Sequence, residues 1–367
     1  MPGCVRLRLK QAPSLIDRYS EGDLLRMTQS RVRWCGGGLV TAVLLAVSVA
    51  TASPAMGASA LLAGAGDIAC DPDHRYFNRG YGTGSGYGAN AYCKQLATSN
   101  LLRGANTVFM LGDSQYEHSS HSNFRRSYAR SWGRYRDRTR PAIGNHEYGP
   151  GLKCGPTRCS PLLGVSGYFD YFGSRAGPRP SRPLSRGPSQ HGYYSYNVGA
   201  SWHVVVLNSM CWAVGGCGAG SPQHRWLERD LAANRARRCI LAYWHHPPFS
   251  SGQSRGYPTY YDAFWRTLHG RGADVVLAGH DHVYERFGRQ DEDGSPSKRL
   301  NGHLGPREFM VGTGGKNNGK FVTTRRNSQK RIRAHGVLRL RLDSRGYVWR
   351  FARIYDGASL DRGSAGC

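Results

Sequence analysis

Five short apolar segments, each ending on a potential metal ligand, dominate the hydrophobic pattern of the chain. Apolar runs of this length that are bounded by turn residues indicate buried strands. Four of the five have Gly directly before the polar residue, where the missing Cβ lets a neighbouring backbone or an ion come close. The segments read LLAGAGD at 61–67, VFMLGD at 108–113, PAIGN at 141–145, ILAYWH at 240–245 and VVLAGHDH at 275–282.

The rest of the hydrophobic pattern predicts helices and further strands around these segments. Phe124, Tyr128 and Trp132 recur every four residues, which indicates one face of a helix. Two strand-like stretches on either side of Gly199 predict a hairpin. The predicted hairpin strands are 193–197 and 202–207, further helices are predicted over 223–231 and 260–268, and further strands over 337–342 and 347–354.

Neither an internal repeat nor a clear linker divides the chain after residue 60, so we predict a single mixed α/β domain over residues 61–367. In α/β sheets, binding sites lie at the carboxyl ends of the strands. The five segments deliver Asp, Asp, Asn, His and a His-x-His pair to that edge, which is a ligand set suited to two metal ions. The candidate ligands are Asp67, Asp113, Asn145, His245, His280 and His282.

The first 60 residues follow a different pattern. A mostly apolar run over 39–52 is preceded by two arginines and followed by a small-x-small sequence at 58–60. These are the marks of a secretory signal peptide, and the run is short for a membrane span. We therefore expect a signal peptide over residues 27–60 and an extension over residues 1–26, ahead of a second possible start at Met27. An uncleaved N-terminal anchor is the alternative.

Cysteine usage agrees with export. Ten cysteines are present, and eight of them follow residue 60. An even number in an exported chain favours disulfides, and no C-x-x-C pair supports the alternative of a thiolate metal site. Our hypothesis pairs Cys154 with Cys159 and Cys211 with Cys217, which close short loops, and assigns Cys70–Cys93 and Cys239–Cys367 from the remaining residues.

The chain is strongly basic. Its net charge is +26, of which residues 1–60 contribute +4, so +22 remains after them. Such a field attracts anions, and phosphate esters, nucleic acids and anionic envelope polymers all qualify. Neither zinc-finger spacing nor a basic heptad region nor an RNA-recognition segment is present, so we predict a phosphate-ester substrate and no nucleic-acid module. An arginine-rich soluble surface without a partner is the alternative.

The ligand-bearing segments also form a set of motifs that resembles a known superfamily. They read GDIAC at 66–70, LGDSQYE at 111–117, GNHE at 144–147, WHHPP at 244–248 and GHDHVYER at 279–286. In this order they resemble the calcineurin-like metallophosphoesterases, and GNHE together with GHDH is a specific signal. The resemblance implies a four-layer α/β/β/α sandwich and the hydrolysis of phosphoric esters.

One departure points to a subgroup of that superfamily. The first motif is usually Asp-x-His, and Ala69 stands at the position of that His. Tyr116, three residues after Asp113, stands where purple acid phosphatases place a metal-bound tyrosinate. Because this chain both lacks the histidine at position 69 and has a tyrosine at position 116, the chain resembles the purple acid phosphatases. The alternative is that Tyr116 is a packing aromatic beside two divalent ions.

The resemblance implies two metal ions. Cations about 3.5–4 Å apart need a shared carboxylate, and Asp113 supplies it. A phenolate in place of a neutral imidazole adds negative charge, which favours Fe(III) in the first site, whereas the imidazoles of the second site favour divalent Zn, Fe or Mn. The ligands would be Asp67, Asp113, Tyr116 and His282 for the first ion, and Asp113, Asn145, His245 and His280 for the second.

The resemblance also implies a mechanism in which a metal-bound hydroxide attacks phosphorus. His146, next to Asn145, would stabilise the phosphoryl group or protonate the leaving group, with a buried structural role as the alternative. His246, next to His245, would contact the substrate or support its neighbour. Purple acid phosphatases carry a further imidazole after the fourth motif, whereas the next histidine here is His269.

The sequence therefore predicts a phosphatase that acts on phosphomonoesters and is secreted, with retention at the cell envelope as the alternative to release. A phosphodiesterase of the same fold is the first alternative. An exported polyanion-binding protein with a vestigial site is the second, but a site without metal has no physical need for seven donors.

Overall fold

The computed structural model describes residues 59–84, 91–149, 165–177 and 191–367. The chain separates into two units at Ser53 and Pro54, and the described residues all belong to the second. The predicted extension over 1–26 and most of the predicted signal peptide lie outside the described residues. The first strand begins at Ala60, the last residue of the predicted signal segment.

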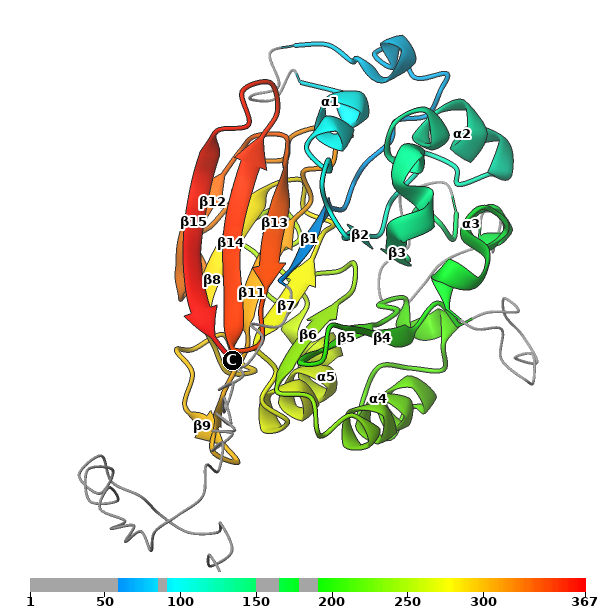
Figure 1. Ribbon diagram of the computed structural model, residues 1–367. Helices are drawn as coiled ribbons and strands as arrows, with labels where there is room; N and C mark the ends of the chain where they lie inside the picture. Colours follow the sequence, from blue (N-terminus) through cyan, green and yellow to red (C-terminus); the bar gives the residue numbers. More distant parts are fainter. Residues whose placement is uncertain (1–58, 85–90, 150–164, 178–190) are drawn as a thin grey trace, which may run out of the picture. The chain divides into compact units, whose positions relative to one another are not determined.

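Two mixed β-sheets form the centre of the described fold (Figure 1). The six-stranded sheet has the order β15-β14-β13-β1-β2-β3, and the seven-stranded sheet has the order β12-β8-β11-β7-β6-β5-β4. The first contains β1 (Ala60–Ala65), β2 (Thr107–Leu111), β3 (Thr139–Ala142), β13 (Gly336–Leu342), β14 (Gly346–Arg353) and β15 (Ser359–Gly366). The second contains β4 (Tyr194–Val198), β5 (Trp202–Val206), β6 (Cys239–Tyr243), β7 (Val275–Ala278), β8 (Tyr284–Arg289), β11 (Arg307–Val311) and β12 (Ser328–Ile332). Two short strands, β9 (Arg299–Leu300) and β10 (His303–Leu304), pair separately.

The five predicted ligand-bearing strands are β1, β2, β3, β6 and β7. In the first sheet β1, β2 and β3 run parallel, and in the second β5, β6, β7 and β11 run parallel. Their carboxyl ends are therefore at common edges of the two sheets. The predicted hairpin is β4 and β5, which pair antiparallel.

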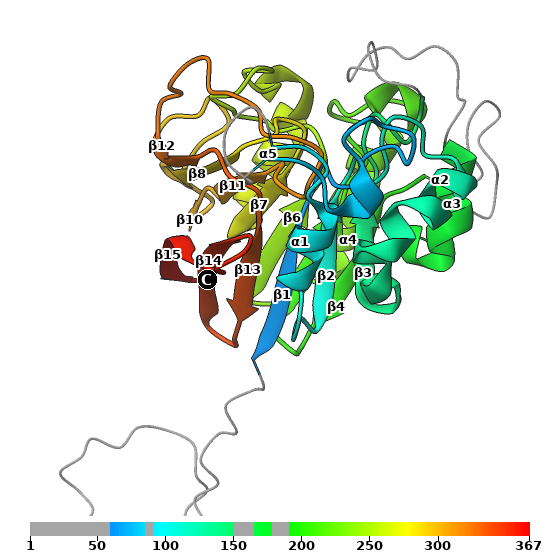
Figure 2. The ribbon, with the colours of Figure 1, turned by 90° about the horizontal axis from the view of Figure 1, so that it is seen from above.

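Helices cover the sheets on their outer sides, which confirms the predicted four-layer α/β/β/α arrangement (Figures 1 and 2). Side chains of β6 alternate between two cores: Leu241 and Tyr243 belong to the core between the sheets, whereas Ala242 packs toward α4 and α5. Ser221 caps α4 by accepting a hydrogen bond from the backbone N–H of His224. The helices are α1 (Gln95–Asn100), α2 (His121–Arg126), α3 (Val165–Phe172), α4 (Pro222–Ala233) and α5 (Pro258–Gly270), with 3₁₀ turns at Asn78–Gly80, Tyr128–Arg130, Trp132–Arg138, Gly173–Ala176 and Cys211–Ala213.

The prediction of one continuous helix through Phe124, Tyr128 and Trp132 is wrong. All three side chains are buried, but the helix is interrupted at Ser127 and Ser131, whose φ/ψ values are not helical. The Ser127 hydroxyl donates a hydrogen bond to the carbonyl of Cys70, and such side-chain bonds compete with helix continuation.

Three disulfides tie the described residues together. They are Cys70–Cys93, Cys211–Cys217 and Cys239–Cys367, as predicted, whereas the predicted Cys154–Cys159 pair lies outside the described residues. Among the helices of the described residues, none has the length and apolar character needed to cross a bilayer.

Candidate metal centre

The loops that follow β1, β2, β3, β6 and β7 bring the predicted ligands into one place. Asp67 and Asp113 follow the first two strands, Asn145 follows β3, and His245 follows β6. The loop after β7 contributes a pair of histidines. Five of the seven side chains are buried and His280 and His282 are half-buried, so the cluster is largely shielded from water.

Four predicted donors form a first cluster around the Tyr116 hydroxyl. Its oxygen lies 2.7 Å from Oδ1 of Asp67, 2.9 Å from Oδ2 of Asp113 and 3.0 Å from Nε2 of His282. Nε2 of His282 is in turn 3.2 Å from Oδ1 of Asp67. The Tyr116 oxygen is thus directed at two carboxylates, which suits a ligand position, and without a metal ion its hydroxyl donates a hydrogen bond there.

A second cluster surrounds Nε2 of His245. This nitrogen lies 3.0 Å from Oδ1 of Asn145, 3.2 Å from Nδ1 of His280 and 3.3 Å from Oδ2 of Asp113. The same Oδ2 atom of Asp113 thus belongs to both clusters. A carboxylate in this position can bridge two cations.

The glycines that precede two of the candidate ligands are required by the close approach of the loops. A Cβ on Gly144 would lie 2.3 Å from Oδ1 of Asp113, and a Cβ on Gly112 would lie 2.6 Å from Nδ1 of His245. Asp67, Asp113 and His280 have φ values of 61°, 50° and 71°, a left-handed conformation that is costly for residues with a side chain. Strained backbone of this kind concentrates at functional sites.

Hydrogen bonds from the far side of the ring orient two of the imidazoles. Nδ1 of His245 donates to the carbonyl of Leu111 at 2.7 Å, which leaves the lone pair of Nε2 facing the cluster. Nδ1 of His282 lies 2.7 Å from the amide oxygen of Asn317, so its Nε2 is likewise free to bind. This is the arrangement that metal-binding histidines require.

Two acidic residues inside the motifs act as scaffolding, a role that the sequence did not assign to them. The buried carboxylate of Glu147 accepts hydrogen bonds from the backbone N–H groups of Asp113 (2.9 Å), Ser114 (2.7 Å) and Gly144 (2.7 Å), and so fixes the loops after β2 and β3. Asp281, between the two histidines of GHDH, accepts a hydrogen bond from Ser254 (2.6 Å). In the sequence, only the positions of Glu147 and Asp281 inside the motifs could have pointed to this structural role.

The electrostatics of the cluster favour a cation. Burial alone would raise the pKa of Asp113, but His245 and His146 lower that pKa well below its usual value. Burial lowers the pKa of His245, and Asp113 outweighs it and raises the pKa to about 9. Burial, with Asp113 and Asp67 beside it, raises the pKa of the Tyr116 phenol well above its usual value. A metal ion would take the place of these protons.

The two predicted catalytic histidines have different surroundings. The backbone N–H of His146 donates a hydrogen bond to Oδ1 of Asp113 at 2.9 Å. The imidazole of His146 is partly exposed, and its ring centre lies 4.2 Å from that of Tyr116. His246 is fully buried, with Nδ1 2.9 Å from the hydroxyl of Ser209 and its ring 4.4 Å from that of His280. Burial lowers the pKa of His246 well below its usual value, and within the described residues its Nε2 has no hydrogen-bond partner.

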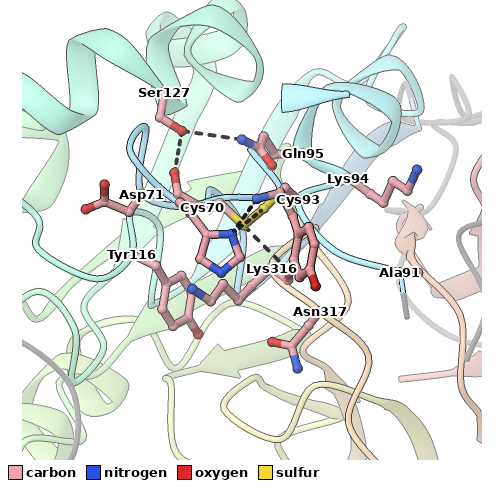
Figure 3. Close-up of a disulfide and its surroundings, with 12 residues drawn as sticks. Cys70, Asp71, Ala91, Cys93, Lys94, Gln95, Tyr116, Ser127, Lys316 and Asn317 are labelled. Carbon is pink, nitrogen blue, oxygen red and sulfur yellow. Dashed lines mark hydrogen bonds between the residues drawn. A yellow bond between two sulfur atoms is a disulfide. The ribbon is translucent and has the colours of Figure 1, made fainter. Parts of the chain in front are cut away.

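Tyr257 and Lys316 lie beside the candidate ligands, although the sequence did not point to either of them. The hydroxyl of Tyr257, just before α5, lies 3.3 Å from Nε2 of His280. The ammonium of Lys316 pairs with Glu117 and lies 4.7 Å from the ring centre of Tyr116. Figure 3 shows this lysine beside the Cys70–Cys93 disulfide. No local motif marks either residue, because the fold alone brings them to the ligands.

His269 does not supply the further imidazole expected after the fourth motif. It is buried in α5, and its Nε2 faces the carbonyl of His303 at 3.1 Å.

Comparisons with known proteins find sequence relatives among the purple acid phosphatases. A purple acid phosphatase from Glycine max is 29% identical over 202 residues, which cover 51% of this chain and 39% of that protein. Purple acid phosphatase 15 from Arabidopsis thaliana is 32% identical over 112 residues, 28% of this chain and 19% of that protein. The chain therefore matches well under half of the length of these relatives.

Solved structures share the fold. The purple acid phosphatase PPD1 from yellow lupin (Lupinus luteus) superimposes with a TM-score of 0.60 at 17% identity, covering 84% of this chain and 54% of that one. PhoD superimposes with a TM-score of 0.54 at 12% identity, covering 85% of this chain and 70% of that one. A sequence model of the calcineurin-like phosphoesterases matches residues 66–284, which span all five strand-end loops. The chain thus belongs to the calcineurin-like phosphoesterase family.

Proposed function

We propose that this protein is a secreted phosphatase that hydrolyses phosphomonoesters with two metal ions. The observation that carries the proposal is the position of Asp113. Its Oδ2 atom lies 2.9 Å from the Tyr116 oxygen of one donor cluster and 3.3 Å from Nε2 of His245 in the other. One carboxylate oxygen between two buried donor sets suits a pair of cations and has no evident use without them.

The donor chemistry supports different ions in the two clusters. The first offers two carboxylates, a phenol oxygen and one imidazole, a hard and anionic set that suits Fe(III). The second offers two imidazoles and an amide oxygen beside the shared carboxylate, which suits a divalent ion such as Zn, Fe or Mn. The proposed ligands are Asp67, Asp113, Tyr116 and His282 for the first ion, and Asp113, Asn145, His245 and His280 for the second.

In the proposed reaction, the metal ions and the side chains of the protein have separate roles. When bound, two such ions supply Lewis-acid activation of the phosphoryl group and a nucleophile from water at neutral pH. His146 has a partly exposed ring beside the bridging carboxylate, where it can donate a proton to the leaving oxygen. Tyr257, whose hydroxyl lies 3.3 Å from Nε2 of His280, can donate a hydrogen bond to a phosphoryl oxygen. His246 is a positioning residue that holds its neighbours from the buried side.

Three features support an exported enzyme for anionic substrates. The described residues contain three disulfides, which persist in oxidising compartments. The chain carries a net charge of +26, which raises the local concentration of phosphate esters. Residues 27–60 have the pattern of a signal peptide, with the catalytic domain proposed over 61–367.

Turnover of p-nitrophenyl phosphate and of bis(p-nitrophenyl) phosphate by the wild type, Asn145→Ala and Asn100→Ala tests the proposal. Asn100 ends α1 and is exposed, so it serves as the matched control. We expect faster turnover of the monoester, a loss on the order of a hundredfold or more in Asn145→Ala, and none in Asn100→Ala. Faster turnover of the diester would make the protein a phosphodiesterase, and undiminished turnover by Asn145→Ala would exclude catalysis at this site.

A further inference from the structure

An arginine-lined cavity lies at the opposite end of the strands from the metal centre. Its volume is about 850 Å³, and its walls include the start of β6 at Ile240 and the residue before β7, Asp274. These are the amino ends of strands whose carboxyl ends carry His245 and His280. The cavity therefore belongs to no part of the proposed active site.

The lining carries far more positive than negative charge. Among the described residues of the lining, the negative groups are the side chain of Asp274 and the terminal carboxylate of Cys367, against six arginines. Asp274 is buried and already engaged, because it accepts the backbone N–H of Ile240 at 3.1 Å and pairs with Arg289 at 3.2 Å. The arginines of the lining are Arg235, Arg237, Arg238, Arg271, Arg289 and Arg299.

Half of these guanidinium groups are held by the protein. Arg289 also donates to the carbonyl of Gly366 at 3.1 Å, Arg237 donates to that of Gly199 at 3.0 Å, and Arg299 donates to that of Gly302 at 2.6 Å. The Cys239–Cys367 disulfide joins the start of β6 to the residue that follows β15. These contacts make the wall of the cavity a fixed structure and not a set of independent surface side chains.

The other three arginines have no such partner. Arg235 and Arg238 belong to the turn between α4 and β6, and Arg271 follows α5. Within the part of the chain that the structure describes, no ion pair or side-chain hydrogen bond engages any of them. Asp274 attracts Arg238 across the lining without a direct ion pair. The three cations still repel one another, and an anion bound between them would relieve that repulsion.

We propose that this cavity binds an anion that carries several linked phosphoryl groups. The guanidinium fork matches phosphate oxygens in a bidentate way, which makes arginine the preferred residue for phosphate-rich ligands. The cavity, at about 850 Å³, is far larger than one phosphate group, and its three arginines come from two separate loops, so a short chain of phosphates can contact more of them than a single phosphate can. Such a ligand is either a small molecule with a triphosphate or a segment of a phosphate polymer.

The test measures binding of two probes by calorimetry at fixed ionic strength. The first probe is a methylene-bridged triphosphate analogue, which resists hydrolysis, and the second is long-chain polyphosphate. The full chain is compared with the double variant Arg235→Ser/Arg238→Ser. Its matched control is Arg341→Ser/Arg362→Ser, which removes two exposed arginines from β13 and β15 and lowers the net charge equally.

We expect the cavity variant to weaken binding of at least one probe by about tenfold or more, and the control variant to leave both affinities within about twofold. The probe that shows the loss identifies the source of the phosphates. Equal losses of affinity in the two double variants would show that only net charge matters and would overturn the proposal. Unchanged affinity of both variants for both probes would overturn it as well. The metal centre is the same in all three proteins, and p-nitrophenyl phosphate turnover should not change, so the proposal stands or falls independently of the catalytic one.

Discussion

The hydroxyl oxygen of Tyr116 lies 2.7 Å from a carboxylate oxygen of Asp67, a residue 49 positions earlier in the chain. The backbone brings the two loops together, because the N–H of Tyr116 donates to the carbonyl of Ala69 at 2.8 Å. Ala69 is the position at which an imidazole is usual in this superfamily. The tyrosine therefore enters the cluster beside the place where a histidine is missing.

Replacement of this tyrosine should change the colour of the protein. If the first ion is Fe(III) bound by a phenolate, the wild type should absorb visible light and appear violet, and Tyr116→Phe should be colourless. We expect phosphatase activity to fall by about tenfold or more, because one ligand is lost while the fold remains. Visible spectra of both proteins at equal iron content provide the measurement. An active but colourless wild type would refute the assignment of Fe(III)–tyrosinate.

Glu147→Gln should destabilise the loops that hold the ligands. The carboxylate accepts three backbone N–H groups, and an amide in its place would turn a donor toward at least one of them. We expect a loss of about 1–3 kcal/mol in the free energy of unfolding, measured by urea denaturation. Metal content should fall as well. An unchanged midpoint and slope would show that these hydrogen bonds contribute nothing.

Tyr257→Phe tests whether the hydroxyl beside His280 contacts the substrate. Loss of one hydrogen bond to a phosphoryl oxygen should lower kcat/KM by about tenfold, with metal content unchanged. Tyr260→Phe is the control, because Tyr260 is a more exposed tyrosine in the first turn of α5. Kinetic constants equal to those of the control would exclude a role in binding, and loss of metal would assign Tyr257 to the support of His280.

The contribution of Asp274 to the free energy of unfolding should decrease as pH rises. Burial raises the pKa of this carboxyl from 3.8 to about 6, so the folded state binds a proton more tightly than the unfolded state does. Its contribution is fully present below pH 4 and is lost as pH rises through 6, a change of about 3 kcal/mol. The difference in unfolding free energy between the wild type and Asp274→Asn, measured from pH 4 to 7, should decrease by this amount. A flat or rising difference would contradict the expected direction.

Local sequence was sufficient for the strands that precede the candidate ligands, because each is a short apolar run bounded by turn residues and five such runs recur along the chain. The short separation of Cys211 and Cys217 in the sequence was also sufficient to predict their disulfide. The aromatic helix was mispredicted because the Ser127 side chain bonds to Cys70, a tertiary contact that periodicity does not contain.

The remaining site residues depend on how distant segments meet. Glu147 lies inside a recognised motif, but its three backbone donors come from two loops that only the folded sheet brings together. Tyr257 and Lys316 have no motif of their own, and the arginines of the distal cavity come from separate elements. The net charge of the sequence showed an excess of basic residues, but it could not show that six arginines lie around one cavity.

Metal content per chain tests the central claim most directly. Elemental analysis of the purified wild type and of Asp113→Asn should give two metal ions per chain in the wild type and one or none in the variant, because both clusters share Oδ2 of Asp113. A wild type that holds a single ion, or a variant that keeps two, would contradict the proposal that this carboxylate bridges a pair of cations.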